Sequence, residues 1–172
     1  MRRGRVAVAM SGGVDSSVAA AMLVEEGHEV VGFTMQIWPR EFQGDLPPGL
    51  RGCCGLEAVD SARRVARALG IRHYVIDLRE PFERFVIDPF CEEYLRGRTP
   101  NPCIGCNTFV KFGPLLRRAA EVDAAKLATG HYARVDHDDQ RGRWVLRHGV
   151  DKAKDQSYSL YGLSQEQLAR AL

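Results

Sequence analysis

The segment Ser11-Gly12-Gly13-Val14-Asp15-Ser16-Ser17 decides the fold, because it joins an apolar, strand-like run at residues 5–10 to a helical run at residues 17–26. A strand that turns through two glycines into a helix aims free backbone N–H groups and the positive helix end at one point. The hydroxyl groups of Ser11, Ser16 and Ser17 add hydrogen-bond donors there. The lysine of the GxxxxGK[ST] phosphate loop is absent. The segment therefore predicts an anion-binding loop of another type, with a tight helix entrance that binds nothing as the simpler alternative.

The composition is that of one globular domain. With 172 residues, the chain can bury a substantial core, and 45% hydrophobic with 27% charged residues is typical of a soluble protein. The net charge of +2 is too small to indicate nucleic-acid binding, and the arginines near residues 2–5 and 96–98 are expected on solvated faces. No signal peptide precedes the first strand and no run can span a bilayer, which favours the cytoplasm.

Strand and helix patterns alternate along the chain, which predicts an α/β fold with a parallel twisted sheet and helices on both faces. We expect strands at residues 5–10, 29–34, 72–77 and 126–129, and a second helix at 56–69. An aromatic helical stripe at 82–94 is predicted to be core, with a kink or break at Pro89. Residues 38–52 and 96–107 are expected to be loops, with Pro114 in the first turn of the next helix. A hairpin at 133–136 and 143–147 and a capping box at Ser164 and Gln167 complete the pattern.

The sequence Cys103-Ile104-Gly105-Cys106 is the second motif whose side chains could bind a metal or react. Two cysteines at this spacing can bind zinc or an iron–sulfur cluster, form a redox disulfide, or provide a nucleophilic thiol. Five cysteines without a secretion signal indicate a reducing compartment, where chemistry or metal binding is favoured over disulfide staples. Cys91, within the aromatic stripe, is expected to be a small core residue. Because ligands of open α/β sheets bind at the carboxyl ends of the strands, loop 11–17, Met35, the two cysteine segments and Gly130 are expected at one edge.

Five motifs in order make the chain resemble the tRNA-specific 2-thiouridylases, members of the PP-loop ATP pyrophosphatases. The motifs are Ser11 to Ser17, Cys53-Cys54-Gly55-Leu56-Glu57, Thr99-Pro100-Asn101-Pro102 through Cys106-Asn107, Ala128-Thr129-Gly130-His131-Tyr132-Ala133-Arg134, and Asp151-Lys152 with Lys154-Asp155-Gln156-Ser157-Tyr158. The resemblance covers the whole chain and implies a single PP-loop ATP-binding domain at residues 1–172. It also implies ATP-dependent replacement of O2 of the tRNA wobble uridine (uridine-34) by sulfur.

The same resemblance implies roles for individual residues. The ATP site would comprise Ala9, Met10, Ser11, Gly12, Gly13, Val14, Asp15, Ser16, Met35 and Gly130. The target base would face Asn101, Pro102 and Cys103, with Cys106 as the catalytic cysteine, and tRNA would contact His131, Lys154, Asp155 and Gln156. Asp15 would either bind Mg²⁺ or act as a capping carboxylate. A sulfur-carrier protein or another persulfide donor would load Cys106.

The chain departs from the family pattern in two ways. Many members carry Asp where this chain has Cys103, so Cys103 and Cys106 offer two thiols that can either work by a persulfide or hold part of a [4Fe–4S] cluster. Family members also continue beyond this length, with a second catalytic cysteine and a β-rich domain. The chain is therefore expected to need a further C-terminal part or a second subunit, unless Cys53, Cys54 or Cys91 substitutes. Two other functions stay open: a PP-loop synthetase that adenylates a small carboxylate or amide, and a non-catalytic module that binds tRNA or a cluster.

Overall fold

Four parallel strands form the central sheet of the computed structural model, which describes residues 3–38 and 56–172. The strand order is β3-β2-β1-β4, with bounds Arg72–Asp77 (β3), His28–Gln36 (β2), Arg3–Ala9 (β1) and Lys126–Ala128 (β4). Since the chain leaves β1 for β2 on one side and β4 pairs on the other, the carboxyl end of β1 is the point where the strand order reverses. The predicted loop at 38–52, Cys53 and Cys54 lie outside the described residues.

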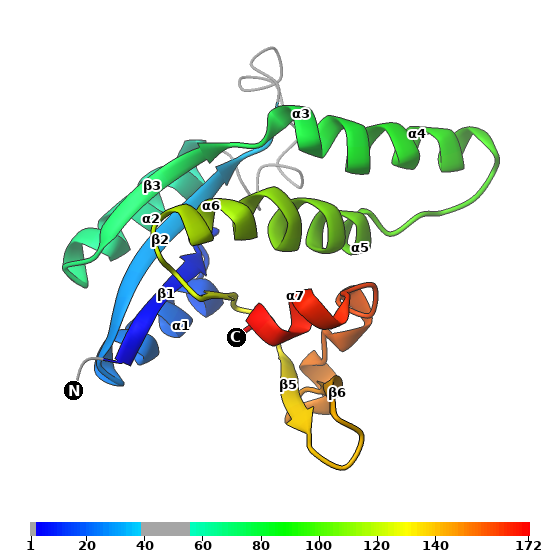
Figure 1. The fold of residues 1–172 in the computed structure, drawn as a ribbon. Coiled ribbons are helices and arrows are strands. Elements are labelled where there is room, and N and C mark those ends of the chain that lie inside the picture. Colours follow the sequence, from blue (N-terminus) through cyan, green and yellow to red (C-terminus); the bar gives the residue numbers. More distant parts are fainter. Residues whose placement is uncertain (1–2, 39–55) are drawn as a thin grey trace.

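Helices cover both faces of this sheet, as the alternating pattern predicts (Figure 1). On one face, Val6, Val8 and Met10 pack with residues of α1 (Val14–Glu25) and α2 (Leu56–Ala68). On the other face, Ala7 and Phe33 belong to a core with the helical run of α5 (Pro102–Gly105), η3 (Cys106–Leu115) and α6 (Leu116–Glu121). The predicted α/β fold class is confirmed. No helix among the described residues is long and apolar enough to cross a membrane.

The aromatic stripe is helical but mostly not core, so that prediction is wrong. The chain is helical through α3 (Arg79–Phe82), η2 (Glu83–Ile87) and α4 (Asp88–Leu95), and Pro89 lies in the first turn of α4 after a π-helical turn. Phe82 is buried, whereas Tyr94 is 59% exposed and Cys91 is exposed as well. Figure 1 shows that α4 extends beyond the sheet, and none of its residues is buried.

The cysteine motif lies in a helix rather than in the predicted loop. Asn101 is the N-cap, since its Oδ1 accepts a hydrogen bond from the N–H of Cys103 (3.0 Å), and Pro102 takes the first helical position. The helical run then continues to Glu121 with a kink at Gly113, whose φ and ψ are −109° and −107°. Pro114 follows this kink, so it restarts a helix that began well before it.

The C-terminal third contains the predicted hairpin and the predicted capping box. Strands β5 (Ala133–Asp138) and β6 (Arg143–His148) pair antiparallel, followed by the short helices η4 (Lys152–Lys154) and η5 (Ser157–Ser159). Helix α7 (Gln165–Arg170) begins with the reciprocal hydrogen bonds of Ser164 and Gln167. The Gln167 amide also donates to the carbonyl oxygens of Thr108 (3.0 Å) and Phe112 (2.8 Å). One side chain therefore caps α7 and anchors it on the π-helical part of η3.

Candidate active site

The loop after β1 has a shape that two backbone contacts impose. Gly12 has a φ of +76°, which L side chains rarely adopt, and a Cβ there would lie 2.9 Å from the Cα of Ala58 in α2. On the opposite side, a Cβ on Gly130, which follows β4, would lie 2.7 Å from the backbone nitrogen of Ser16. Glycine is therefore required at both positions, and the loop is held between α2 and the end of β4.

Helix α1 starts without a side-chain cap. Gly13 is the N-cap residue, and the hydroxyl groups of Ser16 (3.2 Å) and Ser17 (2.8 Å) donate back to its carbonyl oxygen. The N–H groups of residues 12–16 donate to no acceptor within residues 3–38 and 56–172. A cluster of unsatisfied N–H groups at a helix N-terminus, on a tight glycine turn, fits the phosphate groups of a nucleotide. The serine hydroxyls, which the sequence offered as phosphate donors, instead hold the loop itself.

The other predicted nucleotide residues lie at this sheet edge but differ in access. Met10 and Met35 have buried side chains at the ends of β1 and β2, with exposed fractions of 2% and 5%, and Ala9 is half-buried. Val14 and Asp15 are exposed in the first turn of α1. The structure therefore brings the loop and Gly130 together. It buries the two methionine side chains in different cores, Met10 on the α1–α2 face of the sheet and Met35 on the opposite face.

Asp15 does not cap α1, so the simpler alternative for this residue is not supported. Its Oδ1 accepts a hydrogen bond from the phenol of Tyr132 at 3.0 Å, across 117 positions of sequence. Mg²⁺ sites in nucleotide-binding proteins commonly use one or two carboxylates together with the ligand's phosphates. Asp15 beside the free N–H groups fits that arrangement. Tyr132 is the residue that sequence reasoning missed, because only its position in the motif, and no spacing, connects it to Asp15.

His131 follows Gly130, whose backbone contacts the loop at Asp15 and Ser16. Its Nδ1 lies 2.8 Å from the Thr129 hydroxyl oxygen. Burial, and secondly the positive charge of Lys111, lower the pKa of His131 from 6.5 to about 4. At neutral pH the imidazole is therefore uncharged. It can exchange hydrogen bonds with a base edge, but it offers no positive charge to a phosphate.

The two thiols of the cysteine motif are one helical turn apart at the start of the α5–η3 run. Cys103 and Cys91 are exposed, and Cys106 is half-buried. Asn101 and Pro102, which precede the two cysteines in sequence, are also exposed. In the part of the chain that the structure describes, no group of three His, Cys, Asp or Glu side chains is arranged to hold a metal ion. These residues alone therefore do not fit a [4Fe–4S] cluster.

The segment from Lys154 to Ser159 contacts both the helix that carries Cys103 and Cys106 and the residue Tyr132, which bonds to the loop after β1. Asn107, the residue after Cys106, is buried, and its amide donates to the Ser159 carbonyl oxygen (3.0 Å). Gln156 pairs with the backbone of Tyr132, and the Lys154 ammonium lies 5.5 Å from the Tyr132 ring centroid. The substrate residues predicted around position 155 are therefore between the two halves of the candidate site.

Asp155 is held tightly inside this segment. Its carboxylate accepts hydrogen bonds from the N–H of Gly149 (2.7 Å) and the Ser157 hydroxyl (2.8 Å), and lies 2.9 Å from His148 Nδ1. The Gly149 N–H and then His148 hold the pKa of Asp155 well below its ordinary value. The carboxylate therefore shapes the segment that carries Lys154 and Gln156.

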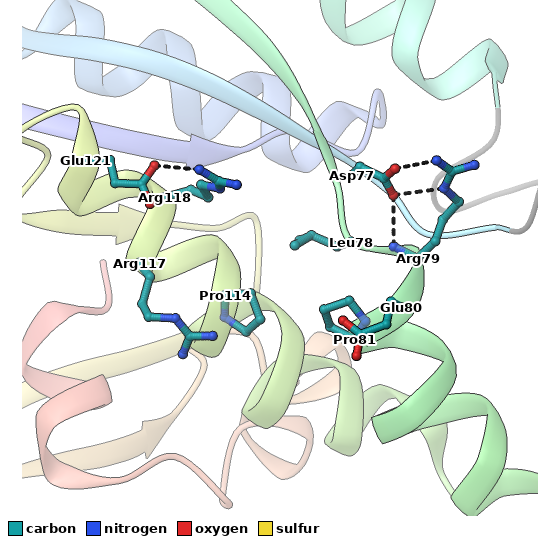
Figure 2. A pocket seen from close by; sticks show the side chains of 9 residues that line it. All are labelled: Asp77, Leu78, Arg79, Glu80, Pro81, Pro114, Arg117, Arg118 and Glu121. Atoms are coloured by element: carbon teal, nitrogen blue, oxygen red, sulfur yellow. Dashed lines mark hydrogen bonds and ion pairs between the residues drawn. The ribbon is translucent and has the colours of Figure 1, made fainter.

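A separate pocket of about 560 Å³ lies between the end of β3 and α6 (Figure 2). Its walls include the ion pairs Asp77–Arg79 and Arg118–Glu121, with Arg117 on the same side as Arg118. Three acidic side chains balance three arginines there, and none of the predicted site residues lines it. This pocket is therefore distinct from the candidate active site.

Comparison with known proteins agrees with the motifs. Residues 4–172 match the family described as the tRNA methyl transferase HUP domain. The chain is 56% identical over 172 residues to the tRNA-specific 2-thiouridylase MnmA of Pelotomaculum thermopropionicum, covering 100% of this chain and 47% of that protein. It is 53% identical over 171 residues to the protein of the same name from Salinibacter ruber, covering 99% of this chain and 45% of that protein. The chain thus spans about half the length of the curated relatives it matches.

Among solved structures, one similar chain is described as a "predicted subunit of tRNA methyltransferase" from Methanocaldococcus jannaschii. The TM-score is 0.48 and the sequence identity is 24%, over 74% of this chain and 53% of that chain.

Proposed function

Because the chain belongs to the family described as the tRNA methyl transferase HUP domain, we propose that it is the ATP-binding and thiol-bearing part of a tRNA-specific 2-thiouridylase. The family resemblance drawn from the sequence motifs is confirmed. One observation carries the proposal: the uncapped start of α1 is linked by hydrogen bonds, through Tyr132 and residues 154–159, to the helix that carries both thiols. An activating site and a sulfur-bearing site would then act on one substrate. In this proposal residues 1–172 form a single ATP-binding domain.

The first step would activate O2 of the wobble uridine, which is a poor leaving group. O2 attacks the α-phosphorus of ATP, an O–P bond forms, the α–β P–O bond breaks, and pyrophosphate leaves while N3 loses its proton to water. The N–H groups of residues 12–16 would hold the phosphates and stabilise the charge that develops on them. Mg²⁺ held by Asp15 would supply further charge neutralisation. Main-chain atoms of Ala9, Met10, Met35 and Gly130, at the ends of β1, β2 and β4, would lie beside the nucleotide.

The second step would deliver sulfur from Cys106. A sulfur-carrier protein or another persulfide donor leaves a persulfide on Cys106, and its terminal sulfur attacks C2 as AMP departs with O2. A second thiolate then attacks Cys106 Sγ, which breaks the S–S bond, releases 2-thiouridine and leaves a disulfide to be reduced by a thiol reductant. Cys103, one turn away, or a cysteine outside the described residues would supply that thiol. Asn101 and Pro102 would face the base, and neutral His131 with Lys154 and Gln156 would contact the tRNA.

The test measures two products from the full chain incubated with Mg·ATP, a persulfide donor and tRNA transcripts. We expect pyrophosphate release that depends on a tRNA with an unmodified wobble uridine, and 2-thiouridine after digestion of the tRNA. Cys106→Ala should keep pyrophosphate release and abolish 2-thiouridine, while Cys91→Ala, an exposed thiol away from the motif, should change neither.

Two results would contradict the proposal. ATP–pyrophosphate exchange without tRNA, stimulated by a small carboxylate, would identify a synthetase. Tight tRNA binding with neither pyrophosphate nor 2-thiouridine would identify a non-catalytic binding module.

A further inference from the structure

Tyr132 is the one described side chain that bonds to the loop carboxylate. Its phenol donates to Asp15 Oδ1 at 3.0 Å, and Asp15 has no other hydrogen bond or ion pair among residues 3–38 and 56–172. The Tyr132 side chain is 37% exposed, so it lies at the surface of the site rather than inside the core. A bond to one carboxylate oxygen fixes the rotation of the group and leaves the other oxygen available for a cation. The orientation of Asp15 therefore depends on Tyr132.

The backbone of Tyr132 is fixed from the opposite side by the segment at 149–156. Its N–H donates to Gln156 Oε1 (3.0 Å), and its carbonyl oxygen accepts from the Gln156 N–H (2.9 Å). A Cβ on Gly149 would lie 2.8 Å from that same carbonyl oxygen, so the two strands of chain are in direct contact. The Lys154 ammonium lies 5.5 Å from the ring centroid, within the range of a cation–π interaction. The position of Tyr132 therefore depends on Lys154 and Gln156.

These two sets of contacts place Tyr132 between the proposed RNA contacts and the proposed metal ligand. We infer that Tyr132 is a positioning residue that couples RNA bound at Lys154 and Gln156 to the Asp15 carboxylate, so that RNA and Mg·ATP bind cooperatively. This inference rests on the proposed function, which puts RNA at residues 154–156 and ATP at loop 11–17.

The physical step is a change in the charges around the ring. An RNA phosphate attracts the Lys154 ammonium away from the Tyr132 ring, and a base that bonds to the Gln156 amide competes with the Tyr132 N–H for Oε1. Either event moves the phenol relative to Asp15. Because coupling between two ligands is reciprocal, RNA must change the affinity for Mg·ATP by the same factor by which Mg·ATP changes the affinity for RNA.

The experiment measures that factor in both directions on the full chain. The dissociation constant of a Mg²⁺-bound non-hydrolysable ATP analogue is measured with and without saturating tRNA, and that of tRNA with and without the analogue. In the wild-type chain we expect a coupling of about tenfold, within the usual range for two-site coupling. Tyr132→Phe removes only the phenol oxygen, and we expect tRNA to bind alone within about twofold of wild type while the coupling factor falls to about one.

The control is Tyr158→Phe, since Tyr158 is exposed in the same segment and, among the described residues, the hydrogen bond to Asp15 comes from Tyr132. It should keep the tenfold coupling. A second variant, Lys154→Gln, should reduce the coupling and weaken tRNA binding. Wild-type coupling that persists in Tyr132→Phe, with both ligands bound, would overturn the inference and leave the proposed function intact. A wild-type chain that binds neither ligand would overturn the proposed function, and the inference with it.

Discussion

The low pKa of His131 predicts a pH-dependent stability that a single substitution should remove. Burial and Lys111 lower the pKa from 6.5 to about 4 in the folded chain. Since the unfolded chain binds the proton more readily, the free energy of unfolding falls as the pH drops below 6.5, and the loss is complete only below about 4. At about 1.4 kcal/mol per pH unit the full difference is about 3 kcal/mol. Because the imidazole is partly reached by solvent, we expect about 1–2 kcal/mol of loss between pH 7 and pH 5.

The assay is urea unfolding of the wild type and His131→Gln at pH 7, 6 and 5, with the slope of free energy against pH compared between them. We expect His131→Gln to lose less free energy of unfolding over this range, by about 1–2 kcal/mol. His137→Gln is the control, because His137 lies on the exposed hairpin strand β5, and it should retain the wild-type slope. If His131→Gln and the wild type decline equally, the imidazole is not held neutral by burial and Lys111, and the argument that His131 meets the base edge rather than a phosphate fails.

Three further predictions test the loop, the helix anchor and the 149–157 segment. Gly12→Ala places a Cβ against Ala58 and forces a positive φ on alanine, so we expect a loss of at least about 2 kcal/mol of stability and a loss of nucleotide binding. Gly4→Ala, with open space around it, should change neither property. Chemical unfolding measures the stability and ATP titration measures the binding. Gln167→Glu keeps the acceptor for Ser164 but loses the donor to Thr108 and Phe112, so urea unfolding should show a loss of about 2–3 kcal/mol, against about 1 kcal/mol for Ser164→Ala. Asp155→Asn should loosen the segment at 149–157, which is measured as faster proteolysis there and weaker tRNA binding. Because the Asp155 pKa is lowered, the difference in proteolysis rate between variant and wild type should be present at neutral pH and vanish as the pH falls below the ordinary carboxyl range.

The elements that local patterns specify could be predicted from the sequence. Strand β3 has the predicted bounds, and the hydrogen bonds of Ser164 and Gln167 are those of the predicted capping box. Both are local features: a short segment that contains Tyr74, Val75 and Ile76, which favour strands, and two polar residues three positions apart. The parallel order of the sheet followed from the alternation of strands and helices.

Features that depend on distant contacts could not be predicted in the same way. An apolar helical face in the sequence does not show whether another element of the fold packs against it. The prediction that Cys91 and the aromatic stripe are buried therefore failed on α4, where Cys91 and Tyr94 are exposed. Two prolines near the cysteine motif indicated a loop, although Asn101 and Pro102 together form a good helix start. Tyr132 and Asp15 are 117 positions apart, and no local spacing could have paired them.

The two glycine contacts of the nucleotide loop have a mechanical consequence. Gly12 rests against the backbone of α2 and Gly130 against the first turn of α1, so the width of the loop is set by main-chain atoms on both sides. Side-chain rotamers change quickly and at little cost, but neither contact can yield without moving a whole helix or strand. Substitutions that repack the core should therefore leave the geometry of the loop intact as long as α2 and β4 stay in place. Conversely, a shift of α2 by a fraction of an ångström would change the width of the loop directly, because no side chain lies between the Gly12 backbone and α2.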